Sequence, residues 1–237
     1  MICPKKIFYR SLKKKLKKKD TVLVFASIIS IAIILSYIAG KFAILLLPLD
    51  LISYFELQEE SSPPFYLLML VVSALGEFAW SLLLTMIIAT VFALRRQWLE
   101  AIFMLATTSS VLLTFALKGI IQRPRPFPIS ENATGLIQKI NQYSYPSGHV
   151  LFFVVFFGFL AYLAWIYLTG LSRIIVISLC AGLIILIGPS RVFLGAHWAS
   201  DVAGSYVLGA LWLSILILAH QWIVNFYCPD SQFSKTR

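Results

Sequence analysis

The stretch YPSGHVLFFVVFFGFLAYLAWIYLTGL, residues 145–171, contains the feature that decides the fold class of this chain. From residue 150 to residue 171 the stretch is almost entirely apolar and holds no charged side chain. A helix needs about 20 such residues to cross the hydrocarbon core of a bilayer. We therefore expect a membrane-spanning helix over 150–171, beginning directly after the polar residues 145–149.

Apolar runs of similar length recur on both sides of this one. The composition agrees, since 59% of the residues are hydrophobic, 13% are charged and the mean hydropathy is +0.87. Such a chain uses lipid as its solvent, so we predict an all-α fold, a polytopic bundle of about six transmembrane helices. The expected spans are residues 21–39, 76–94, 101–117, 150–171, 174–188 and 202–224.

The net charge of +10 is concentrated at the N-terminus, where nine of the 20 Lys and Arg residues lie between Lys5 and Lys19. A basic cluster next to a membrane span binds anionic lipid head groups, and nucleic-acid binding is the weaker interpretation. We predict a basic cytoplasmic arm over 1–20, one six-span domain over 21–228 and a cytoplasmic tail over 229–237.

The distribution of basic residues predicts the topology. With the arm in the cytoplasm, alternation of the spans leaves Arg95, Arg96 and Arg173 on the cytoplasmic side, as the positive-inside rule requires. The acidic loop near residues 50–60 then faces outward. The apolar segment 65–75 is expected to enter the membrane obliquely or to lie at its surface, because Glu77 interrupts the run.

Three polar clusters are placed on the non-cytoplasmic face by this topology. The first runs from Lys118 to Pro126 and carries Arg123 and Arg125 in a proline-stiffened segment. Taken alone, it also fits basic side chains that snorkel to the interface.

The second cluster, Tyr145-Pro-Ser-Gly-His149, precedes the span quoted above. Ser147 is placed to cap this helix, and a helix N-terminus provides N–H groups for an anion. His149 would stand beside that anion as a proton donor or acceptor. An ordinary cap followed by an interfacial histidine is the alternative.

The third cluster, Ser190-Arg-Val-Phe-Leu-Gly-Ala-His197-Trp-Ala-Ser-Asp201, is the most specific. His197 and Asp201 are four residues apart, which on a helix would place imidazole and carboxylate on one face. Arg191 supplies a fork-shaped donor for phosphate oxygens. A salt-bridged interfacial pair is the alternative, but ionisable groups in so apolar a chain favour function. By contrast, His220 lies inside the last expected span and is interpreted as a packed or interfacial histidine.

Together the clusters read Lys118, six residues, Arg125-Pro; Pro-Ser-Gly-His149; and Ser-Arg191, five residues, His197, three residues, Asp201. This order resembles the type 2 phosphatidic acid phosphatase (lipid phosphate phosphatase) superfamily, over roughly the C-terminal half of the chain. The resemblance implies that His197 is a nucleophile, that Asp201 orients it and that His149 transfers protons. It further implies that the phosphate oxygens are held by Lys118, Arg125, Arg191 and the backbone at Ser147 and Gly148.

The resemblance implies a metal-independent lipid phosphatase without cofactors. The short loops and compact length favour a bacterial inner-membrane protein, and the predicted topology places its site in the periplasm. The substrate stays open among undecaprenyl diphosphate, phosphatidylglycerol phosphate, phosphatidic acid, diacylglycerol diphosphate and lipid A phosphates, and we place an isoprenyl diphosphate slightly ahead. A lipid phosphotransferase is the nearest alternative. A vanadium-dependent haloperoxidase and a non-catalytic transporter or scaffold are weaker ones.

Overall fold

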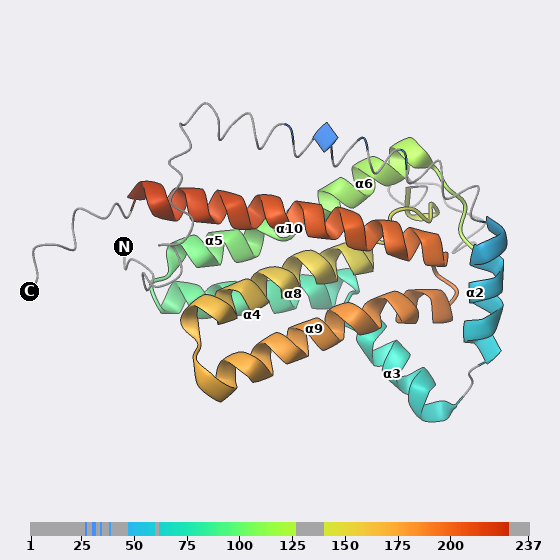
Figure 1. Cartoon of the computed structure of the whole chain (residues 1–237), viewed down its shortest axis with the longest axis horizontal. Helices are drawn as coiled ribbons and strands as arrows, with labels where there is room; N and C mark the ends of the chain where they lie inside the picture. Colours follow the sequence, from blue (N-terminus) through green and yellow to red (C-terminus); the bar gives the residue numbers. More distant parts are fainter. Residues whose placement is uncertain are drawn as a thin grey trace, which may run out of the picture.

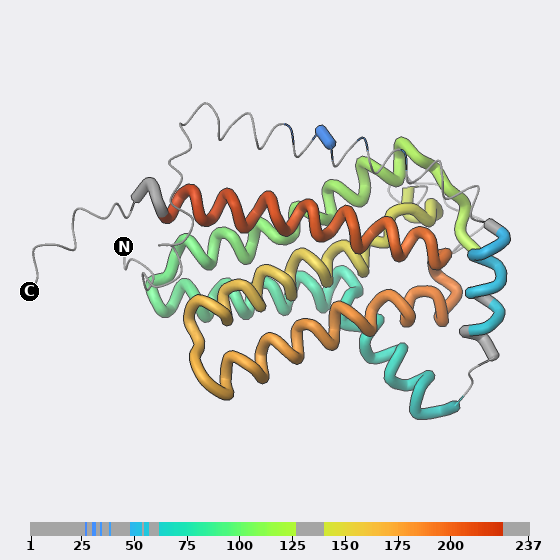
Figure 2. Tube along the Cα trace, viewed as in Figure 1, coloured from blue at the N-terminus to red at the C-terminus, as the bar shows by residue number. Residues whose placement is uncertain are grey.

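A computed structural model of the chain describes residues 47–59, 62–126 and 140–227, with residues 27, 30, 31, 34 and 38. Within this part the chain is helical, and most of the long helices run side by side in one bundle (Figure 1). Tracing the chain shows that α2 (Leu47–Glu59) lies across one end of the bundle (Figure 2). The helical membrane fold predicted from the sequence is confirmed.

Helix α8 (Gly148–Tyr167) is the centre of the bundle and packs against both α9 (Gly170–Phe193) and α10 (Ala199–Tyr227). Every residue from Val150 to Phe157 is buried. A helix that is hydrophobic all round is expected to lie inside a bundle. The expected span over 150–171 is therefore present, but it ends at Tyr167, where Leu168 adopts an extended conformation.

Helices α9 and α10 are both longer than the spans expected at 174–188 and 202–224. Helix α9 continues through Pro189 to Phe193, so Ser190 and Arg191 belong to its last turns and not to a loop. Helix α10 begins at Ala199. Only a short turn is left between the two helices, and it carries His197.

The span expected at 101–117 is built from two helices, α5 (Trp98–Ala106) and α6 (Ser109–Ile121), which together run from Trp98 to Ile121. The break between them is lined by hydroxyl side chains, which re-satisfy backbone groups where a helix is interrupted in a membrane. Four of these hydroxyls donate to carbonyls three residues earlier, at distances of 2.6 to 2.8 Å: Thr107, Thr108, Ser109 and Ser110.

The segment around Glu77 is also broken. Helix α3 (Pro63–Ala74) meets α4 (Phe78–Leu94) at an angle of 64°. The segment expected to enter the membrane obliquely or to lie at its surface is thus α3. It packs on α9, where the hydroxyl of Ser190 donates to the carbonyl of Met69 at 2.8 Å.

The acidic segment near residues 50–60, expected as an outer loop, is instead largely the helix α2. Asp50 in its first turn is buried and accepts from the backbone N–H of Ser200 at 2.8 Å. This contact attaches α2 to the start of α10, because the first N–H groups of a helix have no intrahelical acceptor.

Four described helical segments are long and apolar enough to cross a membrane, and the bent α3–α4 pair would make a fifth. The first expected span, 21–39, lies mostly outside the described residues, as do the arm at 1–20 and the tail at 229–237. The chain is a multi-pass membrane protein, while its division into these three parts stays a prediction.

Candidate functional site

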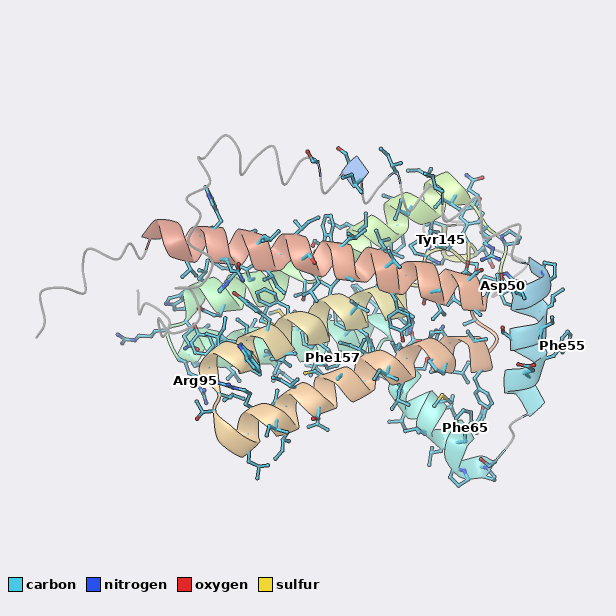
Figure 3. The ribbon with its side chains drawn as sticks, in the orientation of Figure 1. Asp50, Phe55, Phe65, Arg95, Tyr145 and Phe157 are labelled. Atoms are coloured by element: carbon cyan, nitrogen blue, oxygen red, sulfur yellow. The ribbon has the colours of Figure 1, made fainter. Side chains whose placement is uncertain are left out.

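The three polar clusters come together at the end of the bundle where α6 and α9 end and α8 and α10 begin. Figure 3 labels Tyr145 and Asp50 at this end, and Arg95 at the opposite end. The positive charges of Lys118, Arg125 and Arg191 all act on His197. The sequence-based expectation that the clusters share one site therefore agrees with the geometry.

His197 lies in the turn between α9 and α10, so the expectation that it shares a helix with Asp201 was wrong. The turn is possible because Gly195 adopts a left-handed φ of 68°. The N–H groups of Ala196 and His197 both donate to the carbonyl of Arg191, at 3.1 and 3.2 Å. The imidazole is nevertheless near the carboxylate, with 3.9 Å between His197 Nδ1 and Asp201 Oδ2.

The His197 side chain is buried, and its environment favours the neutral imidazole. Burial lowers the pKa of His197 well below its ordinary value, and neighbouring positive charges lower it further. These charges lie on Arg125, Arg191 and Lys118. The free site therefore presents an uncharged histidine among cations, which is the form that has a lone pair for attack.

Asp201 is held by several donors at the start of α10. Its carboxylate accepts from the Arg123 guanidinium, from the Ser144 hydroxyl and, at 3.1 Å, from the backbone N–H of Trp198. Arg123 also forms a 2.6 Å ion pair with Asp50. Arg123, one of the six residues between Lys118 and Arg125, thus holds Asp201 in position.

The start of α8 supplies part of the site. Ser147 occupies the N-cap position, but its hydroxyl makes no capping hydrogen bond. Its backbone N–H donates to Ser205 Oγ at 2.7 Å and is therefore not available to bind an anion in the way expected from the sequence. The Ser147 hydroxyl has no hydrogen-bond partner and can bind the anion instead. Gly148 lies against Thr114, where an added Cβ would come within 3.3 Å of a methyl carbon.

Two of the basic side chains are anchored by backbone carbonyls. Lys118 on α6 is buried and donates to the carbonyl of Tyr143. Arg125 donates to the carbonyls of Asn141 at 3.0 Å and Ala196 at 2.7 Å. Burial lowers the pKa of Arg125 to about 10, so the guanidinium remains charged at neutral pH.

Arg191 and His149 each keep a buried polar atom without a partner. Arg191 donates from Nη1 to the Ser73 hydroxyl on α3, while its Nε makes no hydrogen bond. His149, the second residue of α8, has its Nε2 at 3.4 Å from Glu77 Oε1 without forming a hydrogen bond.

Among the described residues, the buried polar atoms without a hydrogen-bond partner at this end of the bundle include Ser147 Oγ, His149 Nε2 and Arg191 Nε, whereas His197 Nδ1 faces Asp201. Buried polar groups are normally paired, and each exception requires an explanation. Here the unpaired atoms occur together with three basic side chains, so the arrangement fits an anion with several acceptor oxygens. In the described residues, no three His, Cys, Asp or Glu side chains are grouped to hold a metal ion.

Several residues that shape the site were missed from the sequence: Asp50, Ser73, Ser144 and Ser205. The serines gave no signal, because hydroxyls in an apolar chain commonly bond to their own helix. Asp50 gave one, as an acidic residue beside an apolar run, but it was interpreted only as an indicator of topology.

Residues 98–225 of the chain match the sequence model of the PAP2 superfamily. The chain belongs to the PAP2 superfamily. The match covers α5 to α10 and therefore every basic and catalytic candidate named above.

Individual PAP2 relatives agree with this assignment. The chain is 33% identical to phosphatidylglycerophosphatase B of Bacillus subtilis over 143 residues, which are 59% of this chain and 68% of the relative. It is 31% identical to an undecaprenyl-diphosphatase of Sulfolobus acidocaldarius over 111 residues, 45% of this chain and 48% of the relative.

A solved PAP2 structure has the same fold. The crystal structure of a transmembrane PAP2 type phosphatidylglycerolphosphate phosphatase from Bacillus subtilis matches with a TM-score of 0.63 and 25% identity, over 90% of this chain and 98% of that one. The predicted family and the assignment to its phosphatases are confirmed. The roles of individual residues and the metal-independent chemistry stay predictions.

Proposed function

We propose that this PAP2 phosphatase hydrolyses a phosphomonoester or diphosphate of an amphiphilic lipid through a covalent phosphohistidine. The observation that carries the proposal is the group of unpartnered buried atoms, Ser147 Oγ, His149 Nε2 and Arg191 Nε, that lies together with three basic side chains around His197. A phosphoryl group supplies the negative charge and the acceptor oxygens that such a site lacks.

The phosphate oxygens are bound from three directions. Lys118, Arg125 and Arg191 neutralise the charge that phosphoryl transfer redistributes over these oxygens. The Ser147 hydroxyl and the N–H of Gly148 add donors at the start of α8, where the helix dipole favours an anion. Positioning and neutralisation are the main requirements of this reaction, and both are met without a metal ion.

His197 is the nucleophile in this mechanism. With Nδ1 facing Asp201 at 3.9 Å, Nε2 is left to attack phosphorus, so that an N–P bond forms while the P–O bond to the lipid breaks. The attacking imidazole gains positive charge, which the carboxylate stabilises. Catalytic hydrogen bonds are often long in a free site and shorten when substrate binds.

His149 handles the protons of both steps. As the P–O bond breaks, an imidazolium at His149 gives its proton to the departing lipid oxygen. The neutral imidazole then takes a proton from the water that attacks the phosphohistidine, which releases phosphate and restores both histidines.

The position of the site favours a substrate drawn from the outer leaflet of a bacterial inner membrane. Arg95 and Arg173 lie at the other end of the helices, and basic residues mark the cytoplasmic side. The active site is then periplasmic, at head-group depth, with both termini in the cytoplasm.

The proposed substrate is a class of lipids, the phosphomonoesters and diphosphates of amphiphilic lipids. The two curated relatives are named for phosphatidylglycerophosphate and undecaprenyl diphosphate, so their names support both a monoester and a diphosphate. The sequence-based preference for an isoprenyl diphosphate stays a prediction.

A phosphate-release screen tests the proposal. Purified protein is given one lipid at a time from the five candidate classes, with His197→Ala as the blank and no second lipid to accept the phosphoryl group. Release of free phosphate from at least one lipid, absent in the blank, is expected. Full release by His197→Ala would reject the mechanism, and release that depends on added acceptor lipid would identify a phosphotransferase.

A further inference from the structure

Glu77 lies at the sharp bend where α3 is followed by α4. It occupies the N-cap position of α4, yet its carboxylate makes no capping hydrogen bond. The side chain is 63% exposed, which keeps the carboxylate ionised, and its Oε1 lies 3.4 Å from His149 Nε2.

The turn is fixed against His149 by close packing. A Cβ added at Gly76 would lie 2.4 Å from His149 Cδ2 and 3.2 Å from Phe153 Cε2, so only glycine fits. Arg191 holds the neighbouring helix α3 through the Ser73 hydroxyl. The Glu77 carboxylate is therefore placed beside the imidazole by the backbone of the turn as well as by its own contact.

The charges that face His149 make this contact important. Arg191 on α9 and Arg125 before α8 both oppose a positive charge on the imidazole, and His149 in turn acts on His197. Glu77 is the carboxylate that favours the imidazolium. The Asp201 carboxylate instead accepts hydrogen bonds from Arg123 and Ser144.

We propose that Glu77 is a positioning residue that favours the protonated form of His149, the form that acts as the general acid of the reaction. This inference rests on the proposed function. In the free site His149 Nε2 lies 3.4 Å from Glu77 Oε1 without forming a hydrogen bond, so a proton on Nε2 stays available to the departing lipid oxygen. When the P–O bond breaks, the proton moves from His149 to that oxygen, and the neutral imidazole later accepts a proton from water. Glu77 itself exchanges no proton.

The variant Glu77→Gln removes the charge and keeps the shape, and Glu56→Gln is its control. Glu56 is an exposed glutamate on α2 that is not among the groups acting on His149. For a lipid phosphate, kcat/KM of Glu77→Gln is expected to fall about tenfold above neutral pH, because loss of one charge partner corresponds to roughly one pKa unit of the acid. The alkaline limb of the kcat/KM profile should move to lower pH by about the same amount, while the acid limb stays in place.

A second substrate distinguishes loss of the Glu77 charge from a structural change of the site. 4-Nitrophenyl phosphate releases a stable phenolate that needs no general acid, so Glu77→Gln should retain nearly full kcat/KM on it, and Glu77→Asp should restore part of the loss on lipid. Equal losses on both substrates, an unmoved alkaline limb, or a profile like that of Glu56→Gln would overturn the inference. Because His197→Ala is inactive if the proposed function holds, full activity of His197→Ala would identify failure of that function instead.

Discussion

Two buried histidines sit beside carboxylates at opposite ends of the bundle, and only one pair is surrounded by cations. His197 Nδ1 lies 3.9 Å from Asp201, and His220 Nε2 lies 3.7 Å from Glu100. Proximity to a carboxylate therefore does not distinguish a catalytic histidine from a packed one. The difference lies in the surroundings of each pair.

The Glu100–His220 pair is enclosed. The His220 ring has edge contacts with Phe103, Phe159 and Tyr162, with centroids 5.2 to 5.8 Å away. Its Nδ1 is 3.1 Å from the Tyr162 hydroxyl, and the Tyr167 hydroxyl donates to Glu100. Packing of this kind stabilises helices, and it agrees with the prediction that His220 is a packed or interfacial histidine and not a catalyst.

Exchange of the two histidines for alanine gives the largest contrast. His197→Ala is expected to lower kcat/KM on the best lipid by at least about 10³-fold, because the covalent step is lost. His220→Ala should keep kcat/KM within about threefold and lower the thermal midpoint, because it leaves a cavity among aromatic rings. Phosphate release and thermal unfolding of detergent-purified protein measure both. Comparable activity losses in the two variants would remove the distinction.

The two arginines of α9 provide a matched pair of cations. Arg191 is buried at the site end, whereas Arg173 lies 4.8 Å over the Trp165 ring at the other end. Arg191→Ala is expected to lower kcat/KM about 10²-fold, the usual cost of one donor to a reacting oxyanion. Arg173→Ala should have little effect on the rate. Inhibition by inorganic phosphate gives a second readout, since only Arg191→Ala should weaken it, and equal inhibition of both variants would contradict the assignment.

Asp50 and Glu100 are buried carboxylates without a role in the reaction, and their variants distinguish a residue that positions the site from one that only stabilises the fold. Asp50→Asn leaves Arg123 with less negative charge and loosens Asp201, so we expect kcat/KM to fall about tenfold through misplacement of the catalytic pair. Glu100→Gln should change only the thermal midpoint. An Asp50→Asn protein with normal kcat/KM and a lowered midpoint would show that α2 only stabilises the fold.

The acid limb of the pH profile shows the smallest effect. His197 must be neutral to attack, and its lowered pKa keeps it neutral as the pH falls, so the acid limb of kcat/KM should lie below about pH 6.5. Arg125→Gln removes one of the charges that lower this pKa, and the limb should move to higher pH by less than about one unit. Arg173→Gln is the control. A limb that Arg125→Gln moves to lower pH would contradict this electrostatic description.

Sequence reasoning succeeded where short-range patterns determine structure. The apolar run after His149 predicted α8 within a few residues, and alternation of the spans gathered the three polar clusters at one end. Motif spacing selected Lys118, Arg125 and Arg191, which the fold does bring around His197.

The remaining parts depend on contacts between distant residues. The position of His197 outside a helix follows from the length of α9 and the left-handed Gly195. The attachment of Asp50 to Arg123 requires α2 to fold across the bundle, and the contact between Glu77 and His149 requires the bend between α3 and α4. No periodicity in the chain specifies these pairings.

Trapping the covalent intermediate tests the central claim most directly. Wild-type protein is mixed with a lipid that carries labelled phosphate, quenched during turnover under alkaline denaturing conditions, digested and mapped by mass spectrometry. We predict label on the peptide that contains His197, lost on acid treatment as expected of a phosphohistidine and absent from His197→Ala. Active wild-type enzyme that carries no label on His197 under these conditions, or equal labelling of His197→Ala, would contradict the account.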